Sequence, residues 1–217
     1  EIYTFYNKQI IECDIEIEKV TQSFPDKIDG DTPQTPKKKG KRDSNKNAMN
    51  YDIADQLYKK IGVDLTEVDG LGTVTIQTIV SEIGTDVSKW RTSKHFSNWL
   101  GLCPSNEKSG GKVIRNKTKK VKSRLNKSLR LAAYGLGRSD SWLGGFFRRK
   151  RSQKGPTIAI TATAHKLAVI IYNMIKNKTQ YYDMGSTYYD EKYKNRMVKN
   201  LKQKAKILGY NLDPITT

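Results

Sequence analysis

Few residues in this 217-residue chain could build a disulfide framework or a zinc site. The two cysteines, Cys13 and Cys103, lie far apart and in unlike contexts, so they provide neither paired bridges nor a zinc-binding spacing. A reducing compartment is the simpler expectation. The sequence also has no unbroken run of about 18 apolar residues and no visible signal peptide. We therefore expect a cytoplasmic protein.

Carboxylates and histidines are scarce where catalysis would need them. Between residues 86 and 140 the only acids are Asp86, Glu107 and Asp140, too few to hold the Mg²⁺ of a metal-dependent nuclease. Neither histidine, His95 or His165, lies in the strand–turn–helix motif of a serine hydrolase, and a packing or capping role is the simpler expectation for each. These absences disfavour both enzyme classes within this chain.

Positive charge is abundant and unevenly distributed, with a formal net charge of +18. Residues 1–31 carry eight acids and three bases, whereas residues 108–154 carry sixteen Lys or Arg and one acid. Ordinary solvated surfaces mix both signs, so a polyanion is the expected partner of residues 108–154, with nucleic acid favoured. A solvated helix surface is the alternative.

The N-terminal residues predict a helix that self-associates. Apolar or semi-apolar side chains recur from Tyr3 to Phe24 at alternating spacings of three and four, which is a heptad seam over three repeats. Packing on its own domain is the alternative. Residues 25–47 lack this periodicity and favour a flexible linker or a loop between antiparallel helices. A second helix is expected from near Asn50 to Gly62, so residues 1–62 form a helical hairpin or coiled coil.

Residues 65–83 predict a helix-hairpin-helix, in which a short helix, Gly-Leu-Gly and an apolar helix follow one another. In that motif, backbone N–H groups at the start of the second helix face a DNA phosphate. Gly70 and Gly72 are therefore candidate nucleic-acid contacts. A purely structural turn is an equal alternative. A further short helix is expected after a cap at Ser93.

The stretch GLCPSNEKSGGKVIR, residues 101–115, is expected to form an irregular loop at the edge of the basic region. The hydroxyl of Ser109 could attack a phosphodiester and keep the bond as a phosphoserine ester, if nearby positive charge stabilised the transition state. The chain offers no evident base for the serine proton, so a polar loop serine beside DNA is the alternative. Candidate nucleic-acid contacts in this loop are Lys108, Gly110, Gly111, Lys112 and Arg115.

After this loop the sequence predicts mostly helix. A helix from Lys117 has an apolar back and a basic circumference that suits a phosphate backbone. Ser139 or Asp140 caps the next helix, and an apolar helix over residues 157–176 forms the core. The tail carries several tyrosines and a basic helix from Tyr193 to Leu208 that covers the domain or wraps a partner. The remaining candidate contacts are Lys117, Lys119, Lys120, Lys122, Arg124, Lys127, Arg130, Arg148 and Arg149.

Three ordered blocks, DGLGTVTIQTIVSEIG, SKWRTSKHFSNWLGLCPSNEKSGGK and LNKSLRLAAYGLGRSDSWLGGFF, resemble a known family. They are similar to the C-terminal transposase domain of the DEDD-type transposases of bacterial insertion sequences. These are bridge-RNA-guided recombinases, related to pilin-gene invertases. The resemblance covers about residues 63–177, and residues 1–62 resemble the family's coiled-coil dimerisation region. It implies Ser109 as the nucleophile, a structured guide RNA that pairs with target and donor DNA, and cooperation of subunits in a tetramer.

The resemblance also implies chemistry that this chain does not carry. In the family, an N-terminal RuvC-like domain holds Mg²⁺ with four acidic residues, and no such domain is present in these 217 residues. We therefore expect a fragment, located in the bacterial cytoplasm at the nucleoid, that binds DNA and RNA and self-associates as a homodimer or homotetramer. By itself it should not recombine DNA, and sequence-specific strand exchange by the isolated chain with Mg²⁺ would refute this.

The expected fold is all-α. It comprises the helical hairpin of residues 1–62, a compact transposase domain of residues 63–177 and a basic tail of residues 178–217. Two other function classes stay open. One is a non-catalytic module whose residues 108–154 only grip nucleic acid, in which case Ser109→Ala would change neither recombination nor adduct formation. The other is a structural oligomerisation subunit resting on residues 3–24, whose nucleic-acid affinity would depend little on salt.

Overall fold

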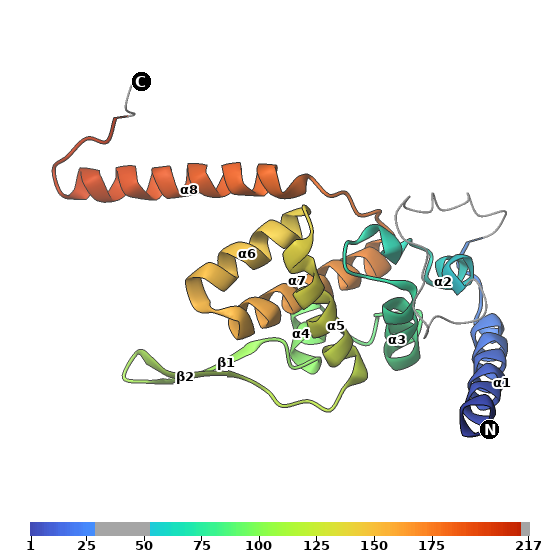
Figure 1. Cartoon of the computed structure of the whole chain (residues 1–217). Helices are drawn as coiled ribbons and strands as arrows, with labels where there is room; N and C mark the ends of the chain where they lie inside the picture. Colours follow the sequence, from blue (N-terminus) through green and yellow to red (C-terminus); the bar gives the residue numbers. More distant parts are fainter. Residues whose placement is uncertain (29–52, 214–217) are drawn as a thin grey trace.

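The computed structural model describes residues 1–28 and 53–213, in which α4, α5 and α6 pack on one central apolar helix, α7 (Figure 1). The expected predominantly helical fold is confirmed, with one small antiparallel sheet added to it in the described residues. The helices are α1 (Ile2–Ser23), α2 (Ile53–Ile61), α3 (Thr73–Ile83), α4 (Ser93–Trp99), α5 (Arg124–Gly135), α6 (Trp142–Lys154), α7 (Pro156–Asn177) and α8 (Gly185–Ile207). Two short 3-10 helices, η1 (Leu65–Glu67) and η2 (Leu136–Arg138), and strands β1 (Pro104–Ser109) and β2 (Lys112–Thr118) complete the set.

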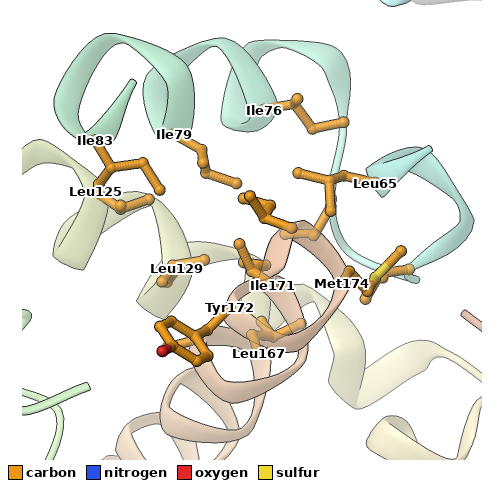
Figure 2. Packing of buried hydrophobic residues seen from close by; sticks show 14 of the residues in the cluster. Leu65, Ile76, Ile79, Ile83, Leu125, Leu129, Leu167, Ile171, Tyr172 and Met174 are labelled. Carbon is orange, nitrogen blue, oxygen red and sulfur yellow. The ribbon is translucent and has the colours of Figure 1, made fainter. Parts of the chain in front are cut away.

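The core forms around α7, which confirms the apolar helix predicted over residues 157–176. Figure 2 shows Ile79 of α3, Leu129 of α5 and Ile171 of α7 converging on one another, and all three are fully buried. A fully buried aliphatic side chain of this size stabilises the fold by about 1.5–3 kcal/mol. By length and composition α7 could also cross a membrane, but half of that apolar stretch is buried inside the protein, as in an ordinary core helix.

Helix α1 confirms the predicted N-terminal helix but leaves its apolar side chains exposed. Its C-terminal end is joined to α2, where Gln56 donates a hydrogen bond to Glu18 over 3.1 Å and Lys60 donates to the carbonyl of Gln22 over 2.8 Å. Tyr3, Ile10 and Val20 on the predicted seam are each more than half exposed. Self-association through this seam stays a prediction. Most of the predicted linker and the expected helix start near Asn50 lie outside the described residues.

Several predicted helix starts are corrected by one or more residues. Thr92, rather than Ser93, caps α4 by accepting a hydrogen bond from the N–H of His95. Ser141, rather than Ser139 or Asp140, caps α6, because Ser139 instead bonds to the side chains of Asp69 and Ser141. Helix α8 starts at Gly185, eight residues before the predicted Tyr193, and the turn before it is held by Asp183, which accepts from the N–H groups of Trp142 and Gly185.

Candidate nucleic-acid interface

The stretch around Ser109 is a β-hairpin, so the prediction of an irregular loop was wrong. Strands β1 and β2 pair antiparallel, with Ser109 opposite Lys112 at the tip. The predicted start of the next helix, at Lys117, was also wrong. Lys117 belongs to β2, and α5 begins only at Arg124. The hairpin projects from the helical body below α6 (Figure 1). Its tip is therefore available to a partner that approaches the protein from outside.

The tip is a two-residue turn made by Gly110 and Gly111. Their φ angles are +56° and +76°, which is the pattern of a type I′ turn and disfavours any residue with a side chain. A Cβ built on either glycine would meet no atom within 4 Å. The glycines are therefore required by the turn geometry and not by packing, and the backbone beside Ser109 is open to a close-approaching strand.

Ser109 and Lys112 are both exposed at the end of the hairpin. No hydrogen bond joins the Ser109 hydroxyl to any side chain that the structure describes, so no general base is seen beside it. The side chains of Lys108 and Arg115, also predicted to contact phosphate, lie outside the described residues. The geometry thus presents a serine hydroxyl and a neighbouring ammonium group side by side at one projecting tip.

The base of the hairpin is fixed by Gly101, which has a φ of +67°. A Cβ at this position would lie 2.6 Å from Cγ2 of Val121 and 2.9 Å from the carbonyl oxygen of Lys119. Glycine is therefore needed for both the backbone conformation and the close approach of the two chain segments. Asn126 adds a hydrogen bond to the carbonyl of Leu100. Both ends of the hairpin are thus held against α4 and α5.

Glu82 of α3 anchors the start of α5, where the chain leaves the hairpin. Its carboxylate accepts hydrogen bonds from the hydroxyl of Ser123 over 2.8 Å and from the N–H of Arg124 over 2.9 Å. Burial by itself would raise the pKa of Glu82, but these hydrogen bonds, that of the Leu125 N–H and the charge of Arg124 outweigh burial and lower the pKa. A carboxylate at a helix N-terminus also interacts favourably with the helix dipole.

Replacing Glu82 by glutamine should therefore lower the free energy of unfolding by about 1–2 kcal/mol at neutral pH. Because the folded pKa lies below the ordinary value of 4.5, the stabilisation is full above that pH and is lost as the pH falls through the folded pKa. The difference between wild type and variant, measured by urea unfolding from pH 7 to pH 3, should shrink accordingly. Glu191→Gln, an exposed change on α8, is the control. A pH-independent difference would contradict this account.

The predicted basic contacts separate into two groups. Lys117, Lys119 and Lys120 are exposed on the hairpin and the segment that follows it. Lys122, Arg124 and Lys127 are exposed at the start of α5. Val121, which was expected on the buried stripe of a helix, is instead exposed in this connecting segment. These cations follow the hairpin directly, so one basic surface extends from Lys112 to Lys127.

Three other predicted contacts bind to other parts of the protein itself. Arg130 of α5 donates to Thr161 of α7 over 2.9 Å, so it joins two helices. Arg148 donates to the carbonyls of Gly137 and Ser139 and thus closes η2. Arg149 is half-buried between two tyrosine rings of α8. Sequence reasoning could not separate these three from the other cations, because their partners lie 9 to 44 residues away along the chain.

The predicted helix-hairpin-helix has a shorter first element than expected, since η1 is a single 3-10 turn. Gly70, with φ +87°, faces α5, and a Cβ there would lie 3.1 Å from Leu136 and 3.3 Å from the carbonyl of Ala132. Its role in the described structure is close packing. Gly72 precedes α3 with open space where a Cβ would lie. The N-terminus of α3 therefore remains accessible beside Gly72.

Histidines and metal ligands offer little further chemistry here. His95 bonds through its ring to Thr92 at the start of α4, over 2.8 Å, in a capping arrangement. His165 is half-buried in α7, where burial and then the charge of Lys166 lower its pKa. In the described ranges there is no group of three or more His, Cys, Asp or Glu that could hold a metal ion.

One family of known proteins matches the part of the sequence that forms α3, the hairpin and α5. Residues 64–148 match the IS116/IS110/IS902 family of transposases. This transposase segment contains Ser109, the glycine turn and the exposed basic surface. It ends at Arg148, within α6, so the last part of α6 and all of α7 and α8 lie beyond it.

Two curated proteins are similar to part of the chain. A Pseudomonas aeruginosa protein named as a family 20 transposase is 26% identical over 126 residues, which is 54% of this chain and 36% of that protein. A Sinorhizobium fredii protein named as transposase y4pF/y4sB is 27% identical over 143 residues, which is 61% of this chain and 35% of that protein. The chain thus spans about a third of the length of these relatives.

Proposed function

We propose that the chain is the DNA-binding, nucleophile-bearing part of a transposase that cleaves and rejoins DNA through a phosphoserine intermediate. One observation carries the proposal: Ser109 lies at the exposed tip of a projecting hairpin within the segment that matches a transposase family. The glycine turn beside it lets a DNA backbone approach, and Lys112 supplies positive charge at the same tip.

The proposed step is an exchange of phosphoester bonds. The Ser109 oxygen attacks phosphorus, and the serine proton passes to a base supplied from outside the described residues. The new oxygen–phosphorus bond forms as the bond to the leaving sugar oxygen breaks, and that oxygen takes up a proton. In the second half, the hydroxyl of another strand end displaces the serine and the DNA is rejoined. No step requires an oxidant or a reductant.

The exposed cations from Lys112 to Lys127 support DNA as the partner, because a concentrated basic surface binds phosphates and releases their counterions. The proposal also includes a structured guide RNA as a partner and action in the bacterial cytoplasm. Copies of the chain associate in it as a homodimer or homotetramer through the exposed seam of α1. The seam residues are exposed along α1, which suits a second copy of the helix.

Detecting a covalent complex between the protein and DNA tests this function. DNA carrying the element's ends is incubated with the active transposase, and complexes that survive denaturation are counted on a gel. A DNA-linked protein band that disappears in the Ser109→Ala variant supports the proposal. Recombination that proceeds in that variant, with or without such a band, would contradict the proposal and leave the chain as a binding module.

A further inference from the structure

A groove between α6 and α8 was not anticipated from the sequence. It encloses a cavity of about 530 Å³, within the size range of ligand sites. Six aromatic side chains line it: Trp142, Phe146, Tyr182, Tyr188, Tyr189 and Tyr193. Figure 1 shows α8 lying across α6, so the groove lies on a different side of the body from the projecting hairpin. Most of its lining comes from beyond the transposase segment.

The rings of this aromatic groove are arranged in two ways. Trp142, Phe146 and Tyr189 contact one another, with ring centroids 5.9 to 6.4 Å apart, and form the inner wall. Tyr182 and Tyr188 remain 82% and 42% exposed although they line the same groove. The inner rings are therefore explained by packing of α8 on α6. The outer two keep part of their rings open to solvent, and the ammonium of Lys192 lies 5.7 Å from the ring centroid of Tyr188.

Positive charge accompanies these rings. Five cations line the groove, namely Arg149, Lys150, Lys166, Lys192 and Arg196, and no carboxylate is among the described residues that line it. Asp190 interacts with Arg149 and offsets part of this charge. An anion entering the groove would thus meet a net positive field.

Several of these cations lie over ring faces. The guanidinium of Arg149 is 3.7 Å from the ring centroid of Tyr193 and 4.6 Å from that of Tyr189. The ammonium of Lys166 lies 5.6 Å from the centroid of Trp142. Cation–π contacts of this kind hold the charges along the aromatic wall, where a bound backbone could reach them. The groove therefore combines stacking surfaces with phosphate-binding groups.

We propose that this aromatic groove binds an unpaired segment of a nucleic-acid strand, with bases stacking on Tyr182 and Tyr188 and phosphates contacting Lys192 and Arg196. Aromatic faces beside cations are the surface that single strands bind, because every base has a face that can stack. A duplex keeps its bases paired and stacked internally, so it cannot use these rings. The inference rests on the proposed function in taking nucleic acid as the partner.

The first test measures base stacking. Fluorescence anisotropy gives the affinity of the whole chain for a labelled 12-nucleotide single strand, as DNA and as RNA, and for the matching duplex. The double variant Tyr182→Ala, Tyr188→Ala should weaken single-strand binding at least fivefold, the lower end expected for one stacked base at about 1 kcal/mol, and duplex binding less than twofold. Whichever of DNA or RNA loses more affinity is the strand that the groove takes.

Controls separate stacking from folding and from general charge. Tyr210→Ala changes a tyrosine that is 72% exposed but lies outside the groove, and it should leave every affinity unchanged. An abasic oligomer keeps the phosphates but lacks bases, so wild type should bind it more weakly than the normal strand and the double variant should not distinguish the two. Wild-type affinity of the double variant for single strands, or equal losses on single strand and duplex, would overturn the inference.

The second test measures phosphate contact. Lys192→Ala should reduce the dependence of single-strand affinity on salt, by about 0.7 in the slope of log K against log salt concentration. Lys194→Ala, two residues away and outside the groove, is the matched control and should leave the slope unchanged. Equal slopes for both variants would overturn the groove assignment.

The outcomes also separate this inference from the proposed function. Groove variants that bind like wild type, while Ser109→Ala loses its DNA adduct, would refute this inference alone. A chain that binds no nucleic acid would refute both the inference and the proposed function.

Discussion

Replacing Ser109 by alanine is expected to lower recombination by at least about 10⁴-fold and to eliminate the covalent protein–DNA complex. The loss follows because alanine has no oxygen with which to form the phosphoester bond, and no other nucleophile is described at the hairpin tip. DNA affinity should change by less than twofold, since the basic surface from Lys112 to Lys127 is untouched. Recombination is measured on a plasmid carrying the element's ends, and affinity by anisotropy.

Ser105→Ala is the matched control for this experiment. Ser105 is an exposed serine on the same strand, β1, and it pairs with Lys117 near the base of the hairpin. Its loss removes a hydroxyl of the same kind but not the one at the tip, so recombination should stay within twofold of wild type. Equal losses in both variants would indicate that the hairpin's structure, and not the Ser109 hydroxyl, is what the reaction needs.

The second large effect is expected at Gly144, where α6 packs against the chain preceding it. A Cβ at this position would lie 2.1 Å from the carbonyl oxygen of Ser139 and 2.9 Å from that of Leu136. Both are backbone atoms, so the clash cannot be relieved by rotating a side chain. Gly144→Ala should lower the free energy of unfolding by about 3 kcal/mol, which corresponds to a Tm reduction of about 6–12 °C in a protein of this size.

Gly135→Ala provides the comparison, because a Cβ there would meet no atom within 4 Å and the backbone is helical. Removing the flexibility of this glycine from the unfolded chain should raise stability by about 0.4–1 kcal/mol. Thermal unfolding followed by circular dichroism measures both variants. A Gly144→Ala protein as stable as wild type would show that α6 and η2 are not packed as closely as described.

Elements with strong periodic patterns could be predicted from the sequence. Helix α7 was predicted almost to its ends, because apolar residues recur along the whole of residues 157–176. Helix α1 was predicted from its heptad spacing. In both cases the local pattern alone decides the structure, whatever the helix packs against.

The hairpin was missed although a signal was present. A Gly-Gly pair between two short segments, as at Gly110–Gly111, is typical of a two-residue turn between strands. The strands around it are short and polar, so the alternation was weak and the glycines were read only as loop residues. Ser109 was singled out as the candidate nucleophile, but its place at a structured tip required the strand pairing.

The aromatic groove could not have been predicted from local patterns. Arg149 meets Tyr189 and Tyr193, which follow it by 40 or more residues, and the contact depends on the turn at Asp183 that folds α8 back over α6. The tyrosines of the tail gave a compositional hint, but nothing in their spacing indicates which of them face α6. Only the packing of the two helices separates the inner rings from the exposed ones.

Mass spectrometry of a trapped protein–DNA complex tests the central claim most directly. The active transposase is denatured during reaction, digested with protease and nuclease, and the peptide that retains a nucleotide is sequenced. The account predicts a nucleotide attached to Ser109, within the peptide between Lys108 and Lys112. A nucleotide on any other residue, or efficient recombination with no attached nucleotide at all, would contradict it.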